Sequence, residues 1–257
     1  MNRYGMKLGS NDIKHIPKAE ELLAAKQCDY VELFVVPGSF KATIDCWKKL
    51  DCTYVIHAPH YAQGMNLADK HCFAANMKMV AEVVRFANDL AAHLIIFHPG
   101  IDGDTAEVAR QLCVINDPRI VVENKPYSTI FNDGRVCVGN SPEQIADIMR
   151  VSKVGFCCDV GHAFCSANSR CVDPVGFLMR FVSLRPSIFH LSDGNINSPI
   201  DSHLNIGQGT YDFKNIMHLV PDNSMITLET PKRDSDPLSE CVDEIIYLNS
   251  ISVQLGS

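Results

Sequence analysis

Short apolar segments recur along the chain, and each is followed by a polar loop and then by a stretch in which apolar residues return at helical spacing. Val, Ile and Phe dominate the short segments, which is typical of strands that are buried on both faces. The pattern predicts eight strands, at residues 6–10, 30–36, 53–58, 93–98, 119–124, 154–159, 187–192 and 225–230.

The segments between these strands predict helices, and several begin with a capping residue or an early proline, as Ser141 before Pro142 does. The predicted helices cover residues 17–26, 39–50, 71–92, 105–114, 142–151, 173–183, 211–219 and 237–249. The third of them carries an apolar stripe that we expect to face the core, formed by Phe73, Met77, Val80, Val84 and Leu90.

Strands that alternate with helices form a parallel sheet through right-handed crossovers. Eight such units in 257 residues predict an α/β fold of the (β/α)8 TIM-barrel type. A doubly wound open sheet is the alternative, but no Gly-rich phosphate-binding turn follows the first strand. No segment resembles a linker, so we expect a single domain over residues 1–257.

Composition and charge limit the classes of function and partner that we expect. The net charge of −7 argues against a uniformly basic surface for nucleic acid, leaves room for a local basic cleft, and suits a carboxylate-rich metal site. We find neither a signal-peptide pattern nor an apolar run long enough to span a bilayer, so we expect a cytoplasmic protein with no membrane partner. The 11 Cys residues form no CxxC pair, and we interpret them as reduced core thiols.

Polar residues follow the apolar part of most predicted strands, and in a parallel barrel these strand ends meet at one face. Imidazoles and carboxylates together favour Zn or Mn over Ca or Mg. Nine such groups exceed the needs of one ion and indicate two or three, with a bridging Glu. The nine are His57, His98, Glu123, Asp159, His162, His190, Asp201, His203 and Glu229.

A structural role for single residues is the alternative, because Pro in "HAPH" and "FHPG" can end a strand that His merely caps. An unpaired buried carboxylate costs several kcal/mol, however, so the coincidence of these groups at one face favours the metal interpretation. Cys157 and Cys158 could ligate as thiolates, but inert buried Cys is favoured. Lys125, Arg135 and Lys232 could grip an anion, although solvated loop charges are favoured.

The motifs around these residues resemble those of endonuclease IV, the metal-dependent apurinic/apyrimidinic endonuclease of the xylose-isomerase-like TIM-barrel superfamily. They are "FHPG" (97–100), "VVEN" (121–124), "CCDVGHAF" (157–164), "FHLSD" (189–193), "DSHLNIGQG" (201–209) and "LETP" (228–231).

The resemblance implies three metal positions. A first ion would be held by His57, His98 and Glu123, and a third by His162, Asp201 and His203. A second would be held by Glu123, Asp159, His190 and Glu229, with Glu123 bridging. His60 is the alternative to His57, because it precedes the Asn-Leu pair at 66–67 by six residues, as the family's first His does.

Three loops depart from DNA-cutting members of this family, since "GSNDIKH", "VVPGSF" and "ENKPYSTIFNDGR" replace the stretches that bend DNA and hold the abasic site. Abasic-site DNA is therefore one candidate substrate, and a small sugar or phosphorylated molecule is the other.

Three functions remain open. A phosphoester hydrolase would use metal-activated hydroxide and no nucleophilic side chain. A sugar isomerase or epimerase would use one ion, with Glu123 and Glu229 moving a proton and His162 on the substrate. A barrel that binds metal without turnover is the third. We expect the hydrolase, because the isomerase does not need His98, Asp201 and His203.

Overall fold

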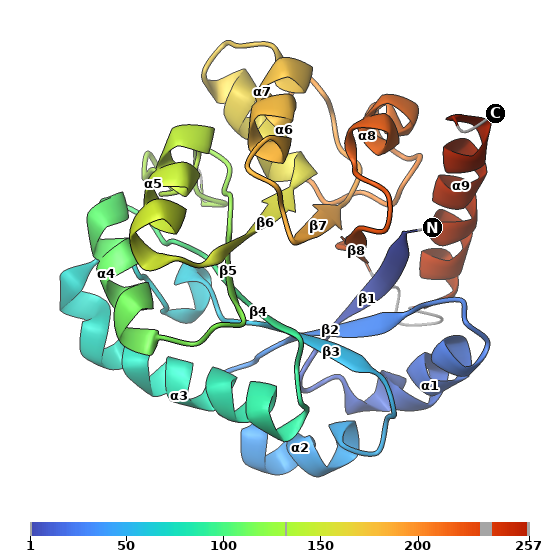
Figure 1. Cartoon of the computed structure of the whole chain (residues 1–257), viewed down its shortest axis with the longest axis horizontal. Helices are drawn as coiled ribbons and strands as arrows, with labels where there is room; N and C mark the ends of the chain where they lie inside the picture. The colour runs from blue at the N-terminus through green and yellow to red at the C-terminus, as the bar shows by residue number, and fades with distance from the viewer. Residues whose placement is uncertain (1, 132, 232–237, 256–257) are drawn as a thin grey trace.

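The computed structural model describes residues 2–131, 133–231 and 238–255, with side chains up to residue 251. Its strands form a closed barrel in the order β1 to β8, and every neighbouring pair is parallel, including the pair β1 and β8 that closes the barrel (Figure 1). The predicted TIM-barrel fold is therefore confirmed. The strands are β1 Arg3–Gly9, β2 Tyr30–Phe34, β3 Thr53–His57, β4 Leu94–Phe97, β5 Ile120–Glu123, β6 Gly155–Asp159, β7 Ile188–Leu191 and β8 Met225–Leu228.

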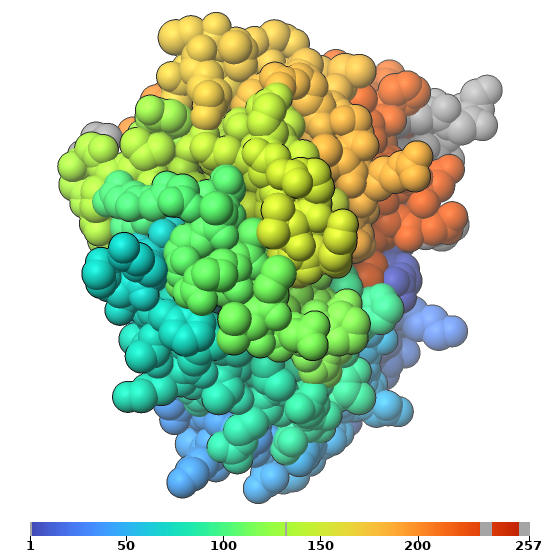
Figure 2. All heavy atoms as spheres, turned by 60° about the vertical axis from the view of Figure 1, so that its left-hand side comes forward, coloured from blue at the N-terminus to red at the C-terminus, as the bar shows by residue number. Residues whose placement is uncertain are grey.

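Helices surround the barrel, and α4 and α5 pack side by side on the face that Figure 2 turns toward the viewer. Among the described residues, none of the helices combines the length and the apolar content that crossing a bilayer requires. The helices are α1 Ile16–Ala24, α2 Phe40–Trp47, α3 Phe73–Asp89, α4 Thr105–Ile115, α5 Pro142–Ser152, α6 Val160–Ser169, α7 Pro174–Val182, α8 Phe213–Leu219 and α9 Ser239–Leu255.

Helix α6 was not predicted. It begins directly after β6, and the carboxylate of Asp159 accepts a hydrogen bond from the backbone N–H of His162 at 2.6 Å as its N-cap. Every residue from Val160 to Ala167 is buried, so this part of the helix has no solvent-facing side and its sequence lacks the amphipathic pattern of a surface helix.

The predicted stripe on α3 is only partly right. Val80 and Leu90 are buried, but Phe73, Met77 and Val84 are half-buried, and the buried face of the helix instead runs through Asn76, Val80, Val83, Phe86 and Ala87. The polar residue Asn76 lies on this buried face, so the pattern of apolar residues did not reveal the face. The Asn76 amide donates to the Asn66 carbonyl at 2.7 Å and to Gln111 Oε1 at 2.9 Å.

Two further expectations need correction or fall outside the description. All 11 cysteines are free, but Cys113 and Cys171 are exposed rather than core thiols. The start of the last predicted helix at Pro237 lies outside the described residues, and α9 is described from Ser239.

The interior of the barrel contains two layers of side chains. The lower layer is apolar except for one hydroxyl and one thiol, and it consists of Tyr30, Val55, Ile96, Val121, Cys157, Ile188 and Met225. Side chains two positions apart on a strand point the same way. The upper layer therefore follows two residues later, and it consists of Glu32, His57, His98, Glu123, Asp159, His190 and Thr227, all of them buried.

Strand β1 takes part in this layering through a glycine. A Cβ on Gly5 would lie 2.1 Å from Cε2 of Tyr30, so only glycine leaves space for the Tyr30 ring in the lower layer. Two residues further along β1, Lys7 joins the upper layer, beside Glu32 of β2. The strand pattern thus places a cation among the polar side chains at the mouth of the barrel.

Candidate metal centre

The upper layer opens into a cavity of about 230 Å³ at the carboxyl ends of the strands. Lys7, His57, His98, Lys125, His162 and Glu229 line its polar part. Phe34, Tyr61, Pro126 and Ile130 line its apolar part. This is the face at which active sites of TIM-barrel enzymes lie.

The first expected donor set is assembled around one carboxylate oxygen. Glu123 Oε2 lies 3.1 Å from His57 Nε2 and 3.0 Å from His98 Nε2, and all three side chains are buried. The other ring nitrogen of His57, Nδ1, lies 2.9 Å from the carbonyl of Ala58. That contact fixes the ring so that Nε2 faces Glu123, as the outer contacts of metal-binding histidines do.

His60 has a different role. Its Nδ1 accepts a hydrogen bond from the backbone N–H of Ala62 at 3.2 Å and caps the short 3-10 helix Tyr61–Gln63. Burial lowers the pKa of His60 to about 3. The ring contacts that of His98, with centroids 5.4 Å apart, but among the described residues it joins no group of metal donors. The geometry therefore favours His57 over His60.

The third expected donor set is assembled on the opposite side of the mouth. Asp201 Oδ2 lies 3.1 Å from His162 Nε2 and 2.7 Å from His203 Nε2. Nδ1 of His162 lies 2.9 Å from the carbonyl of Asn124. Burial lowers the pKa of His162, but the carboxylates of Asp159 and Asp201 outweigh burial and raise it to about 10.

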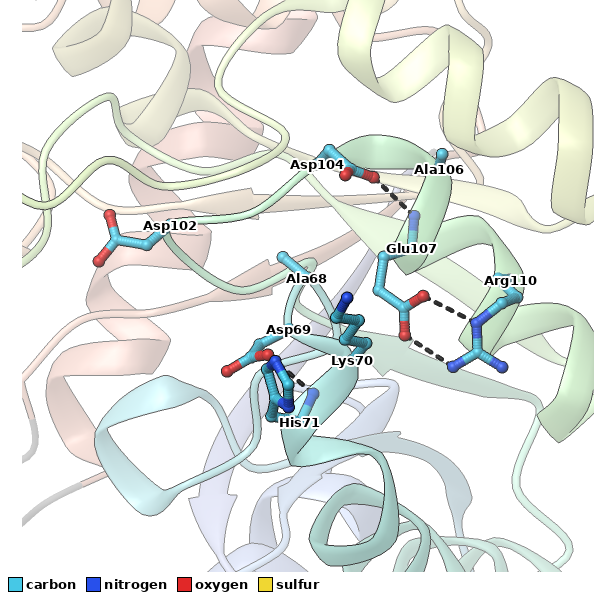
Figure 3. A pocket seen from close by; sticks show the side chains of 9 residues that line it. All are labelled: Ala68, Asp69, Lys70, His71, Asp102, Asp104, Ala106, Glu107 and Arg110. Carbon is cyan, nitrogen blue, oxygen red and sulfur yellow. Dashed lines mark hydrogen bonds and ion pairs between the residues drawn. The ribbon is translucent and has the colours of Figure 1, made fainter.

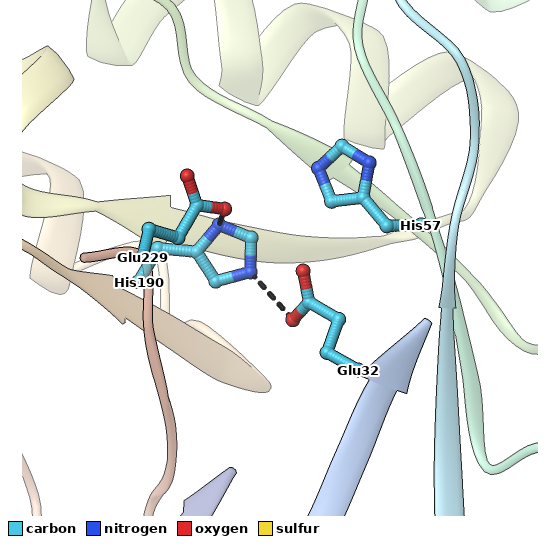
Figure 4. Close-up of side chains that lie close together, drawn as sticks. All are labelled: Glu32, His57, His190 and Glu229. Carbon is cyan, nitrogen blue, oxygen red and sulfur yellow. Dashed lines mark hydrogen bonds and ion pairs between the residues drawn. The ribbon is translucent and has the colours of Figure 1, made fainter. Parts of the chain in front are cut away.

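The second expected set is not assembled as a group of four. Asp159 lies with Glu123 and His162, whereas His190 and Glu229 lie with Glu32 and His57. Figure 4 shows the cause, because His190 is held between two carboxylates. Its Nδ1 lies 2.6 Å from Glu229 and its Nε2 lies 2.9 Å from Glu32.

Glu32 is a site residue that the sequence analysis missed. Its Oε2 accepts hydrogen bonds from Thr227 Oγ1 at 2.7 Å and from His190, and its Oε1 lies 3.2 Å from Lys7 Nζ. Burial raises the pKa of Glu32, but His190 and Lys7 outweigh burial and lower it to about 2. The signal was a charged residue inside an apolar strand, two positions after Tyr30.

Two lysines also reach the site. Lys7 Nζ forms an ion pair with Glu229 as well as with Glu32, and sequence reasoning did not single it out. Lys125 is buried, with Nζ 3.4 Å from Glu123 Oε1 and 3.2 Å from His162 Nε2. The expectation of a solvated loop charge at Lys125 is therefore wrong, because the loop after β5 turns this side chain back into the mouth.

The remaining candidates are two loop cations and two cysteines. Arg135 pairs with Asp133 at 2.6 Å and is partly exposed, as expected for a loop charge, and Lys232 lies outside the described residues. Cys157 and Cys158 are buried, and burial raises the pKa of Cys157 to about 12. Although Cys157 lies near Glu123 and His190, a thiol with so high a pKa is a poor source of thiolate.

A larger hollow of about 430 Å³ lies outside the mouth, between the loop after β3 and the start of α4 (Figure 3). Its carboxylates already have structural roles. Asp69 accepts from the N–H of His71 at 2.8 Å, Asp104 caps α4 by accepting from the N–H of Glu107 at 2.8 Å, and Glu107 pairs with Arg110. These groups are not arranged around a common centre.

The residues at the mouth fit a divalent ion. Nδ1 of His190 and Nδ1 of His98 are buried and have no hydrogen-bond partner. His190 Nδ1 nevertheless lies 2.6 Å from a Glu229 oxygen. A cation shared by the imidazole and the carboxylate would satisfy both groups, and the mixed nitrogen and oxygen donors suit Zn or Mn.

Comparison with known proteins identifies the family of this chain. Residues 29–251 match the family described as xylose isomerase-like TIM barrel. The chain belongs to this family. It is 25% identical to the probable endonuclease 4 of Aquifex aeolicus, over 82% of this chain and 82% of that protein.

Two solved structures share the fold at low identity. Endonuclease IV from Thermus thermophilus has a TM-score of 0.71 at 20% identity and covers 98% of this chain, which spans 99% of that structure. A D-tagatose 3-epimerase-like protein has a TM-score of 0.69 at 16% identity, with the same coverage. An endonuclease and an epimerase-like protein thus share this fold, and this chain combines it with a donor-rich mouth.

Proposed function

We propose that this xylose isomerase-like barrel is a metal-dependent phosphoester hydrolase that uses two or three Zn or Mn ions. One observation carries the proposal. The set His57, His98 and Glu123 shares no residue with the set His162, Asp201 and His203. Two separate sets call for more than one ion, and a single-metal isomerase has no use for the second set.

Bound ions supply hydroxide at neutral pH and offset charge on the attacking and leaving oxygens. The chain's own residues would position these ions. Glu123 belongs to the first set, with one oxygen 3.0 Å from His98, and its other oxygen lies 3.1 Å from His162 of the second set, so the two oxygens can serve both sets. We assign Glu123, Glu229 and His162 to the reacting centre, because each belongs to one of the donor groups that would hold the ions.

A small substrate fits this mouth better than a DNA duplex. The hydroxyl of Tyr61 accepts a hydrogen bond from the N–H of Ile130 at 2.9 Å, and the Tyr61 and Phe131 rings lie 6.0 Å apart. These contacts join the loop after β3 to the loop after β5 beside the cavity. A duplex that carries an abasic site would have to separate them, whereas a sugar-sized molecule would not.

Ion counting and turnover test the proposal together. The purified protein is stripped with chelator and reloaded with Zn or Mn, the ions per chain are counted by elemental analysis, and hydrolysis of bis-p-nitrophenyl phosphate, a small phosphomonoester and an abasic duplex is measured. We expect two or more ions per chain and chelator-sensitive hydrolysis of a small phosphoester. Asp201→Asn should lose one ion and keep the other. A single ion with no phosphoester cleavage would overturn the proposal.

Sugar isomerisation or epimerisation is the second candidate, and one observation favours it. Glu123 and Glu229 both lie near Nδ1 of His190, at 3.5 Å and 2.6 Å, in a cavity of about 230 Å³. Two carboxylates on either side of a small substrate could move a proton across it. Incorporation of deuterium from solvent into a ketose pool, with one ion per chain, would support this function in place of hydrolysis.

A further inference from the structure

Lys7 projects into the cavity from the wall of the barrel formed by β1, β2 and β8. Its ammonium has three N–H donors. Two of its contacts are the carboxylates of Glu229 and Glu32, and its side chain keeps 19% of its surface exposed where it lines the cavity. Glu32 is fully buried and also holds His190, so it fixes the position of this ammonium relative to the donor groups.

Lys125 reaches the same cavity from the opposite wall. It follows β5, which lies four strands from β1 in a closed ring of eight. Its side chain is 8% exposed, its Nζ lies 3.4 Å from Glu123, and it lines the cavity together with Lys7. The two ammoniums therefore face the same space from two sides.

The net charge of the mouth bears on what these lysines bind. Among the described residues, the mouth holds five carboxylates, from Glu32, Glu123, Asp159, Asp201 and Glu229, against two ammoniums. Ions bound by Glu123 and Glu229 would occupy the carboxylate oxygens that the lysines now contact. Two divalent ions would leave the mouth with a positive balance, and in a buried site such a charge attracts an anion strongly.

We propose that Lys7 and Lys125 form an anion subsite that binds the charged phosphate of a small phosphate monoester. A monoester carries a charge of about −1.5 to −2 near neutral pH and offers three oxygens, which suits two ammoniums on opposite walls. An internal phosphodiester carries less charge and continues in both directions, past the contact between Tyr61 and Ile130.

This inference rests on the proposed hydrolase function and deepens it by naming the substrate class. In the reaction, the oxygen of water forms a bond to phosphorus, the ester P–O bond breaks, and the leaving oxygen takes up a proton. The products are inorganic phosphate and an alcohol. Inorganic phosphate is therefore a product and a direct probe of the subsite.

Calorimetric titration of the metal-loaded, full-length protein with inorganic phosphate tests the subsite. We expect Lys7→Met and Lys125→Met each to weaken phosphate binding at least 10-fold with no fewer ions per chain, and Lys7→Arg to stay within about fivefold. Lys49→Met, at an exposed lysine outside the cavity, should change binding less than twofold. Dimethyl phosphate should bind the unmodified protein at least 10-fold more weakly than phosphate.

The outcomes separate the subsite from the hydrolase. Phosphate binding that is unchanged in both folded Lys→Met variants would overturn the subsite, even if phosphoesters are cleaved. Lysine-dependent phosphate binding without any phosphoester cleavage would support the subsite and overturn the hydrolase. If Lys7→Met fails to fold, Lys125→Met and the comparison of phosphate with dimethyl phosphate decide the question.

Discussion

The barrel interior holds an apolar lower layer and, two residues further along the same strands, a polar upper layer. Val121 and Glu123 of β5 illustrate the contrast, because both are buried and both point into the barrel. The lower layer gains free energy from burial alone. The upper layer places carboxylates and imidazoles out of water, which costs free energy unless cations and hydrogen bonds offset it. The same strands thus carry an apolar layer that stabilises the fold and a polar layer that requires cations and hydrogen bonds.

Removal of metal should cause the largest loss of stability, because the polar upper layer then loses its cations. An ion that binds only the folded protein stabilises it by about 4 kcal/mol at 1,000 times its dissociation constant. We therefore expect chelation to lower the free energy of unfolding by about this amount for each tight ion, measured by urea denaturation with and without added Zn. Equal stability under both conditions would show that the upper layer is balanced by protein groups alone.

Glu123→Gln should break the upper layer selectively. One carboxylate oxygen lies 3.0 Å from His98 and the other lies 3.1 Å from His162, and the amide of Gln replaces one of them with NH2 and removes the negative charge. We expect at least a roughly 100-fold loss of metal affinity or activity, equivalent to about 2.7 kcal/mol. Competition with a coloured chelator gives the affinity. Unchanged affinity would remove Glu123 from the metal centre.

Val121→Ala is the matched change in the lower layer, on the same strand. Deleting two buried methyl groups should lower the free energy of unfolding by about 2 kcal/mol, since a cavity remains below the mouth. The number of ions per chain should stay that of the unmodified protein. If ions are lost as well, the two layers are not independent.

A change of one pH unit should produce the smallest effect. The pKa of His162 is raised to about 10, so its stabilising contribution to the metal-free protein is complete below its unfolded pKa of about 6.5. That contribution is lost as the pH rises toward 10, by at most about 1.4 kcal/mol per pH unit. Metal affinity should rise over the same range, because His162 must release its proton to bind an ion. Titrations at pH 6.5, 8 and 9.5 measure both trends, and a metal affinity that does not change with pH would contradict this role of His162.

Several site residues were predictable because parallel strands bring their carboxyl ends to one face. His57, His98 and Glu123 follow directly from this rule, and the structure brings one oxygen of Glu123 within about 3 Å of both histidines. Lys7 and Glu32 were not predicted, because they lie inside β1 and β2 rather than at the carboxyl ends of these strands. A count of two residues from Gly5 and Tyr30 would have found both.

The sequence alone determined the fold and the side of the barrel at which the polar groups gather. The alternation of apolar runs and helical segments predicts both the order and the direction of the strands. Only the tertiary structure decided how those groups divide. It placed His190 between Glu32 and Glu229, separated Asp159 from that pair, and turned Lys125 inward. These choices depend on distances between strands that are far apart in the chain, and local sequence patterns carry no information about such distances.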